Sequence, residues 1–520
     1  MQTGINFSLM PVYINLKEFI NMKNIIKILF LILFLNSYLL PQSNIIYVDA
    51  NNGSDVNPGT IDSPVKNISQ ALSIAGSNIS TMFLRAGTYK ITGSIKLNYS
   101  GEAGNYNQLL AYQGEKVIID CSLLSPGSKG ILLYKDYWHI KNLEIENAPH
   151  NGIYIEGSYN IIENCSIHNN GDTGLHITKG GYNLVLNCDS YFNYDPAKHG
   201  ENADGFGVKY HIGGGNVFKG CRAFNNSDDG WDLWMADSTV TIDSCFAFRN
   251  GINSLNDAAW QGDGNGFKLG GYYIAAPHVV KNCISFDNFS TGRGFDENNN
   301  MAGQTIYNCT SFRNKGDNFH FTNNIAPLNH VIKNCISFQG GVNLTNTIQE
   351  NNSWQGFTVS DTDFLSIDTA LALAPRNRDG SLPSNNFFRL ASSSNFIDAG
   401  VDVGIAYSGK APDLGAFESA YTIEGTNIER EAPEHFELQQ NYPNPFNPST
   451  VIGFFLPNES KVLLAVYNVL GQEKAVLIND VIKEGSHKVR FNASGFPGGV
   501  YFYKIKTGKN SAAKKMLLMK

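Results

Sequence analysis

A cysteine recurs along the middle of the chain, and each time a ring-bearing residue follows it by three positions and Asn by five. The interval between successive cysteines ranges from 23 residues (Cys165 to Cys188) to 38 residues (Cys245 to Cys283). Such a repeat, set in short β-prone runs, indicates an all-β chain wound as a parallel β-solenoid, with one coil per repeat. Six copies keep the pattern, and a seventh has Gly in place of Asn: Cys165-His168-Asn170, Cys188-Tyr191-Asn193, Cys221-Phe224-Asn226, Cys245-Phe248-Asn250, Cys283-Phe286-Asn288, Cys309-Phe312-Asn314 and Cys335-Phe338-Gly340.

The repeated cysteines are expected to form an internal column of free thiols. Seven of the eight cysteines occupy one repeat position, and only Cys121 lies outside it. Parallel strands hold equivalent side chains about 4.8 Å apart, whereas a disulfide needs Cβ atoms nearer to about 4 Å. The repeated Asn is interpreted in the same way as structural, with amides that bond from coil to coil at a turn.

The N-terminal region reads as an export signal. Residues 22–42 contain two early lysines, an apolar stretch and no acidic residue, which is typical of a secretory signal peptide, and Met22 is then the true start, so that residues 1–21 are not part of it. A membrane anchor is the alternative, but the apolar core of residues 28–35 is short for a span. We therefore expect an exported protein.

The charge of the chain restricts the class of binding partner. The formal net charge is −7, with Lys and Arg scattered along the chain, which argues against a nucleic-acid partner. We expect a monomer with a solenoid over residues 44–420. A helix within residues 47–72 is expected to cap its first coil, and residues 395–418 are expected to form its closing segment. Both end segments resemble those of many secreted right-handed β-helix proteins. Repeat signals weaken over residues 342–386, which are interpreted as late coils with loops.

The end of the chain has a different pattern. After a polar linker at residues 421–437, alternating apolar residues over 438–520 predict a small β-sandwich. The run NYPNPFNPST at residues 441–450, with VYNVLGQE and a Lys-rich end, closely resembles the sorting domain of the type IX secretion system. An ordinary accessory sandwich is the alternative. The resemblance implies passage through the outer membrane by the type IX machinery, followed by surface attachment or release.

A second landmark, Gly or Asn followed by an apolar residue, aligns the coils with one another. When these pairs are overlaid, Asp204 and Asp229 come one coil apart, with Asp228 and Asp232 beside them, because residues two apart on a strand share a face. The aligned pairs are Gly152-Ile153, Gly174-Leu175, Gly205-Phe206, Gly230-Trp231, Gly266-Phe267, Gly294-Phe295 and Asn318-Phe319.

The four aspartates in one patch point to a cation. Like charges this close raise one another's pKa unless a cation neutralises them, and clusters of oxygen ligands suit Ca²⁺. The alternative is that Asp before Gly is an ordinary turn residue. The alignment puts Lys268 in the column of Asp232, one coil on, where a bound cation and a partly enclosed groove would lower its pKa and make it a general base.

Three further side chains are candidates for substrate binding. Arg293 and Lys209 fall near the patch and could bind carboxylates of a substrate, although ordinary surface charges are as good an interpretation. Trp234 shares the face of Asp232 and could stack on a sugar, whereas Trp231 is expected in the core.

At these residues the chain resembles the family-nine polysaccharide lyases, which are pectate lyases with a right-handed β-helix. The resemblance rests on ENADGFGVK (residues 201–209), NSDDGWDLW (226–234) and GNGFKLGG (264–271), in this order and spacing. It implies that Lys268 is the base of a β-elimination on polygalacturonate. The calcium ligands that it implies are Asp204, Asp228, Asp229 and Asp232.

Two other functions stay open. A β-helix glycoside hydrolase would use paired carboxylic acids as acid and base. Four clustered Asp residues with an adjoining Lys fit that arrangement poorly. A non-catalytic surface adhesin would use the same aspartates to bind structural Ca²⁺, and it would show no turnover before or after substitution of Lys268.

Overall fold

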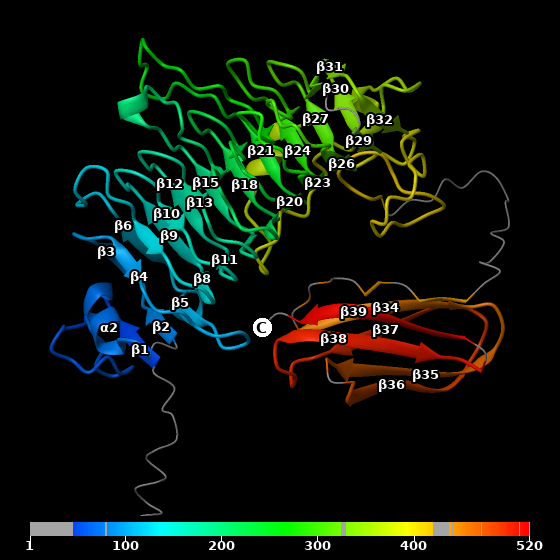
Figure 1. Ribbon diagram of the computed structural model, residues 1–520, viewed down its shortest axis with the longest axis horizontal. Helices are drawn as coiled ribbons and strands as arrows, with labels where there is room; N and C mark the ends of the chain where they lie inside the picture. Colours follow the sequence, from blue (N-terminus) through cyan, green and yellow to red (C-terminus); the bar gives the residue numbers. More distant parts are fainter. Residues whose placement is uncertain are drawn as a thin grey trace, which may run out of the picture.

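The computed structural model describes residues 45–518 with the exception of 79–80, 324–328, 420–435, 439, 442–443, 445, 447, 470 and 509. The signal peptide predicted at 22–42 and nearly all of the predicted linker lie outside these residues. The described chain winds into a solenoid of three parallel sheets, and a smaller antiparallel domain follows it (Figure 1). The all-β class and the parallel β-helix are therefore confirmed.

Each full coil adds one strand to each sheet in turn. The first sheet contains β1 (Ile45–Val48), β2 (Thr81–Leu84), β5 (Asn107–Ala111), β8 (Trp138–Lys141), β11 (Ile161–Glu163), β14 (Leu184–Leu186), β17 (Asn216–Lys219), β20 (Val240–Asp243), β23 (Val279–Lys281), β26 (Thr305–Tyr307), β29 (His330–Lys333) and β32 (Thr347–Glu350). The second contains β3 (Gly87–Lys90), β6 (Val117–Asp120), β9 (Leu143–Glu146), β12 (Ser166–His168), β15 (Asp189–Tyr191), β18 (Arg222–Phe224), β21 (Phe246–Phe248), β24 (Ile284–Phe286), β27 (Thr310–Phe312) and β30 (Ile336–Phe338). The third contains β4 (Ile95–Leu97), β7 (Ile131–Leu133), β10 (Ile153–Ile155), β13 (Leu175–Ile177), β16 (Phe206–Val208), β19 (Trp231–Asp232), β22 (Phe267–Lys268), β25 (Phe295–Asp296), β28 (Phe319–Phe321) and β31 (Val342–Leu344).

Left-handed backbone makes the corner between the first and second sheets. The residue before a repeat cysteine has a positive φ, as in Asn164 (53°) and Asn187 (54°), and Asn is one of the few side chains that adopts this conformation readily. The corner turns the next residue inward, which buries the seven repeat cysteines. Cys121, after β6, is buried as well, and all eight cysteines are free. The predicted column of free thiols is confirmed.

The predicted Asn ladder is also present, at the corner after the second sheet. The side-chain amide of Asn170 donates to Oδ1 of Asn193 at 3.0 Å, and that of Asn193 donates to Oδ1 of Asn226 at 2.9 Å. The same bond continues through Asn250, Asn288 and Asn314. These amides are buried, so the ladder satisfies polar groups that would otherwise be left without partners.

A second polar ladder, which sequence reasoning missed, runs beside the start of the first-sheet strands. Its acceptors change along the axis from Asn Oδ1 to His Nδ1 and Gln Oε1, and this variation hid it in the sequence. Each accepts a hydrogen bond from the backbone N–H of the preceding coil. The members are Asn160, Asn183, Asn216, His278, Gln304 and His330.

The third sheet has the register that the sequence alignment predicted. Tyr154, His176, Gly207, Asp232, Lys268, Asp296 and His320 form one column across seven strands. Trp231 lies on the opposite face and is fully buried in the core, as expected. The predicted columns of side chains are therefore real neighbours.

One α-helix is found among the described residues, and it closes the N-terminal end of the solenoid. Helix α2 (Ile68–Ala75) buries Ile68, Ala71 and Ala75 against the core of the coils and ends at Gly76, whose φ is 55°. The helix expected within residues 47–72 is confirmed, with its end shifted by three residues. Short 3-10 turns lie at Tyr112–Gly114, Pro196–Lys198, Asp361–Asp363 and Thr369–Leu373.

The interpretation of residues 342–386 as late coils is wrong beyond β32. Only β31 and β32 continue the solenoid. Trp354 still packs against the interior core, but residues 357–418 pack along the outer face of the second sheet, and we call them the cover segment. From Phe224 onward this face is a stack of aromatic rings, which would expose a large apolar surface without a cover. The cover segment buries that stack beneath Phe364, Phe387, Phe388, Phe396 and Leu414.

The C-terminal domain is a small antiparallel unit with its own core. One sheet has the order β33 (Glu437–Leu438), β34 (Ser449–Leu456) and β37 (Gly485–Asn492), and the other β36 (Glu473–Ile482), β35 (Ser460–Asn468), β38 (Gly499–Lys506) and β39 (Ser511–Leu518). Its core, which includes Ile452, Leu464 and Tyr503, is separate from that of the coils. No helix within the described part of the chain is long and apolar enough to cross a membrane.

Candidate active site

Five aspartates from three successive coils meet at the N-terminal ends of third-sheet strands. Asp204 precedes β16, Asp228 and Asp229 precede β19, Asp232 lies on β19, and Asp263 precedes β22. The first four are at least 97% buried, whereas 57% of the side-chain surface of Asp263 is exposed. The structure thus brings together the four predicted aspartates and adds a fifth.

Backbone N–H groups orient these carboxylates. Oδ1 of Asp229 accepts from the N–H of Asn265 at 2.7 Å, and Oδ1 of Asp232 accepts from the N–H of Trp234 at 2.9 Å. The other oxygen of Asp229, Oδ2, is buried and has no backbone partner among the described residues, and Nζ of Lys268 lies 3.0 Å from it. A buried carboxylate oxygen that faces only an ammonium group can also serve as a ligand for a metal cation.

The donor set fits a calcium ion. Carboxylate oxygens of Asp204, Asp229 and Asp232 lie within 4.8 Å of one another, and so do those of Asp228, Asp229 and Asp263. Burial raises the pKa of Asp204 to about 8 and that of Asp229 well above its usual value, because Lys209 and Lys268 offset only part of the desolvation. Carboxylates that resist ionisation in this way gain most from a bound cation, and oxygen-only sites suit Ca²⁺.

Lys209 is a buried counter-ion within the cluster. Its Nζ lies 2.8 Å from Oδ2 of Asp204 and 2.7 Å from Oδ2 of Asp232. Burial opposes the ionisation of Asp232, but Lys209 and Lys268 outweigh it and lower its pKa. Contact with a substrate would require Lys209 to leave both carboxylates, so its suggested role in substrate binding stays a prediction.

Lys268 lies between the cluster and solvent. Its Nζ is 3.0 Å from Oδ2 of Asp229 and 3.4 Å from Oδ2 of Asp263, and 12% of its side chain is exposed. Burial alone would lower its pKa, but among the protein groups the carboxylates, led by Asp229 and Asp232, raise it well above the usual value. The fall in pKa expected from the sequence therefore requires that these carboxylate charges be neutralised.

Comparison with known proteins assigns the chain to a protein family. Residues 46–329 match the family described as "Pel9A-like, right handed beta helix region", and residues 440–519 match "Secretion system C-terminal sorting domain". The chain belongs to the Pel9A-like family. This family comprises the family-nine pectate lyases to which the sequence motifs pointed, and the C-terminal domain is a sorting domain.

Relatives of this Pel9A-like chain have the same architecture. It is 41% identical to pectate lyase L of Dickeya dadantii (72% of this chain, 90% of the relative) and 36% identical to pectate lyase PEL9 of Emericella nidulans (66% and 91%). The crystal structure of pectate lyase Pel9A superimposes with a TM-score of 0.68 at 42% identity and covers 72% of this chain and 96% of that chain. A rhamnogalacturonan lyase gives a TM-score of 0.60 at 29% identity (67% and 96%).

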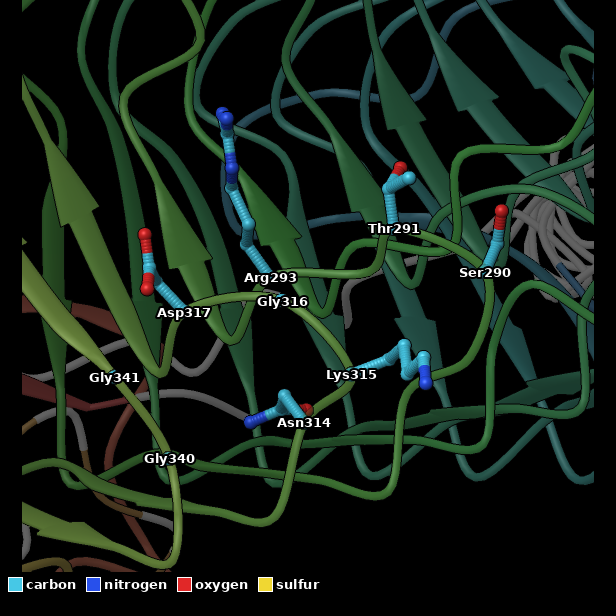
Figure 2. A pocket seen from close by; sticks show the side chains of 9 residues that line it. All are labelled: Ser290, Thr291, Arg293, Asn314, Lys315, Gly316, Asp317, Gly340 and Gly341. Carbon is cyan, nitrogen blue, oxygen red and sulfur yellow. The ribbon is translucent and has the colours of Figure 1, made fainter.

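The remaining predicted residues of the Pel9A-like chain lie around the cluster. Trp234 is half-buried, and its ring meets those of Tyr210 and Tyr272 edge-on, at 5.5 and 6.1 Å between centroids. Arg293 lies one coil beyond Lys268, where its Nη1 bonds Oδ2 of Asp296 at 2.9 Å and its side chain lines a groove (Figure 2). Their roles in substrate binding stay predictions.

Asp263 escaped the sequence alignment because a long insertion separates β21 from β22. The Asp lies three residues before the landmark Gly266, whereas Asp204 and Asp229 come directly before theirs. Its backbone N–H donates to Oδ1 of Asp228 at 2.8 Å, and this bond holds the end of the insertion against the cluster. An acidic residue near the same corner of the two preceding coils was the available signal.

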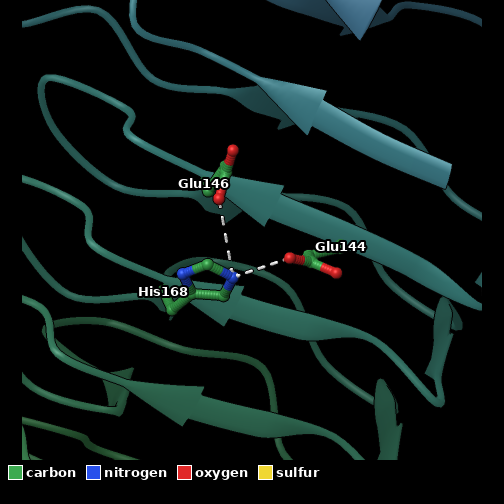
Figure 3. Close-up of side chains that lie close together, drawn as sticks. All are labelled: Glu144, Glu146 and His168. Atoms are coloured by element: carbon green, nitrogen blue, oxygen red, sulfur yellow. Dashed lines mark hydrogen bonds and ion pairs between the residues drawn. The ribbon is translucent and has the colours of Figure 1, made fainter. Parts of the chain in front are cut away.

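Another group of possible metal ligands lies on the second sheet of this Pel9A-like chain. Nε2 of His168 is 3.3 Å from Oε1 of Glu144 and 3.8 Å from Oε2 of Glu146 (Figure 3). The ring of His168 also stacks on Tyr191, at 4.6 Å and 15°, so it begins the aromatic stack of the outer face. Lys116 pairs with Glu144 at 3.2 Å, and a structural role accounts for the group.

Proposed function

We propose that this chain is a calcium-dependent pectate lyase that cleaves polygalacturonate by β-elimination. A single observation carries the proposal, the placement of Lys268 at the solvent edge of four buried aspartates. Membership of a family whose relatives are pectate lyases by name supports it. Calcium dependence and the choice of polymer are the parts that the experiment below addresses.

Asp204, Asp228, Asp229 and Asp232 would hold the calcium ion, with Asp263 as a further ligand at the exposed side. A calcium ion in this place would bind the carboxylate of the sugar at the cleavage point and make its C5 proton more acidic. The four buried side chains suit this role because backbone N–H groups hold them.

Lys268 is the proposed base. Its neutral amine removes the C5 proton of the sugar. The electron pair of the C–H bond then forms a double bond between C4 and C5, and the C4 glycosidic oxygen leaves with the electrons of its bond and takes up a proton from solvent, to which Lys268 returns its own. A new unsaturated non-reducing end forms without consumption of water. The proposal requires Lys268 to be neutral in this step: a bound cation would neutralise the carboxylate charges that raise its pKa, and the burial that lowers its pKa would then be unopposed.

The sorting domain at residues 440–519 implies export by the type IX secretion system. We propose that residues 22–42 first direct the chain across the inner membrane, and that the protein is then attached to the cell surface or released. An extracellular location suits an enzyme whose substrate is a polymer too large to enter the cell.

The test is the ultraviolet absorbance of purified protein with polygalacturonate, in calcium and in chelator. We expect a rise in calcium, from the conjugated double bond of the unsaturated uronate, and none in chelator. New reducing ends without this absorbance would instead indicate a hydrolase. Binding to the polymer with neither signal would indicate an adhesin.

A further inference from the structure

The insertion between β21 and β22 is fastened to the loop that joins β15 to β16. We call residues 252–263 of the insertion the insertion loop. Oδ2 of Asp257 in this loop lies 2.9 Å from Nδ1 of His199 and 3.3 Å from the hydroxyl of Tyr194, both in the β15–β16 loop. The backbone N–H of Gln261 donates to the carbonyl oxygen of His199 at 2.9 Å. Side-chain and backbone contacts therefore join two loops that are far apart in the sequence.

Trp260 fills the space between these two loops and the aspartate cluster. Its indole N–H donates to Oγ of Ser227 at 2.8 Å, and buried Ser227 directly precedes Asp228. Gly200 of the β15–β16 loop gives the ring room, because a Cβ at that position would lie 2.5 Å from Cδ1 of Trp260. The indole thus fixes the insertion loop beside a proposed calcium ligand.

The carboxylate of Asp228 accepts one backbone hydrogen bond from each of the two loops. Its Oδ2 accepts from the N–H of Asn202 in the β15–β16 loop at 2.9 Å, and its Oδ1 accepts from the N–H of Asp263 in the insertion loop at 2.8 Å. Asp263 also carries a carboxylate of the cluster. The placement of both proposed calcium ligands therefore depends on how the two loops are held relative to each other.

We propose that Trp260 and Asp257 are positioning residues that set the calcium affinity of the site. They act through the two loops, which orient Asp228 and carry Asp263. This rests on the proposed function and deepens it, because it makes the insertion loop the part of the chain that adjusts calcium binding. Ligands that are already held in place lose less conformational freedom when a cation binds, so loosening of the loops weakens binding.

The test compares Trp260→Ala and Asp257→Ala in the full-length protein, with Leu255→Ala as the control. Leu255 lies in the same loop and is 60% exposed. Titration calorimetry should show calcium affinity about tenfold weaker for Trp260→Ala, as is usual when a residue that holds metal ligands is replaced. The loss should be about threefold for Asp257→Ala, whose ion pair is partly exposed, and absent for Leu255→Ala. In chelator, the N–H groups of Asn202 and Asp263 should exchange with solvent faster in Trp260→Ala.

Excess calcium separates positioning from contact with the substrate. There we expect kcat and KM of Trp260→Ala on polygalacturonate to lie within about twofold of the parent values, because mass action restores occupancy of the calcium site. A KM that stays raised in excess calcium would make Trp260 a substrate contact and overturn the inference. Unchanged calcium affinity with a lower thermal midpoint in chelator would indicate a purely structural role and also overturn it.

The outcomes distinguish this inference from the proposed function. If the parent protein binds calcium but shows no elimination, weaker binding by Trp260→Ala supports the inference without the lyase activity, and equal binding overturns it. A parent protein that binds no calcium would overturn both. If Trp260→Ala does not fold, Trp260→Phe keeps an aromatic ring and removes the indole N–H. Calcium affinity equal to that of the parent in both Trp260→Phe and Asp257→Ala would then overturn the inference.

Discussion

Two buried lysines and four buried aspartates share one small volume at the centre of the site. Such a group is stable only while every charge has a partner, because removal of one partner leaves another charge buried and uncompensated. Lys209 touches two carboxylates at once and is the most enclosed cation of the group. Lys268, by contrast, reaches the edge of the cluster, which suits it to meet a substrate.

Lys268→Arg is the sharpest test of the base. The guanidinium keeps the positive charge beside Asp229, so that the fold is retained, but it does not give up its proton near neutral pH. We expect turnover to fall by about 10²- to 10⁴-fold, the usual contribution of a general base. Ultraviolet absorbance measures the loss, and calorimetric calcium titration serves as the control. Loss of calcium binding in this variant would contradict the assignment of calcium binding to the aspartates and of proton removal to Lys268.

Asp229 and Asp263 should differ in their effect on calcium. Asp229 is fully buried and belongs to both groups of ligand atoms, whereas Asp263 belongs to one and is mostly exposed. We expect calcium affinity to fall by roughly a hundredfold or more in Asp229→Asn and by about tenfold in Asp263→Asn, since ligand charge sets affinity. Asp62→Asn, exposed near the N-terminus, is the control for titration calorimetry. Equal losses at the two positions would argue against a site centred on Asp229.

At the scale of elements, buried ladders link each coil to the next. The ladder of Asn160, Asn183, Asn216, His278, Gln304 and His330 satisfies backbone N–H groups at the start of first-sheet strands. Burial lowers the pKa of His278 to about 3 and that of His330 to about 4. Both imidazoles are therefore neutral in the folded protein near neutral pH.

This ladder predicts an acid-sensitive contribution to stability. Below about pH 6.5 the unfolded chain protonates these histidines, whereas the folded chain resists protonation down to about pH 3 to 4. The free energy of unfolding therefore falls as pH drops through this window, by about 1.4 kcal/mol per pH unit for each histidine. His278→Gln, which keeps an acceptor as Gln304 does, should flatten this dependence in denaturant titrations at pH 4 to 7.

Arg376 fastens the cover segment to the coils. It pairs with Asp189 and donates to the carbonyl oxygen of Gly220 at 2.9 Å, while Arg222 pairs with the same Asp189. We expect Arg376→Ala to lower the free energy of unfolding by about 1–3 kcal/mol, because Arg222 still compensates Asp189 while buried acceptors lose their donor. Chemical denaturation measures this, with exposed Arg378→Ala as the control. No difference between the two variants would mean that the aromatic contacts and the hydrogen bonds from Arg222 to the carbonyl oxygens of Ala372 and Ala374 hold the segment without Arg376.

At the scale of the whole molecule, the sorting domain has a core of its own. The coils bury one set of apolar side chains inside the solenoid and, with the cover segment, a second set on its outer face, whereas the sorting domain buries a third set. We expect a protein that ends at Ser419 to keep its thermal midpoint and to retain kcat/KM within about twofold, since a domain with its own core can fold alone. Scanning calorimetry and the lyase assay measure both. A large loss of either would show that the sorting domain supports the coils.

The sequence repeat determines much of the fold of this protein. Because each coil must place the same cysteine inward and the same Asn at its corner, the spacing of these residues aligns all strands of the third sheet. That alignment places Asp204, Asp229, Asp232 and Lys268 in neighbouring coils from the sequence alone. Strand order, register and most of the candidate site therefore followed from local pattern alone.

The positions of three features are determined only by the tertiary structure. Asp263 lies at the end of an insertion whose path the repeat does not determine. The ion-pair partners of Lys209 depend on the direction of its long side chain. The cover segment has no periodicity at all, and it finds its place only because the coils have already assembled an apolar outer face. Repeats determine which backbone positions are neighbours, whereas contacts made by loops and flexible side chains are decided by the shape and charge of the surface they meet.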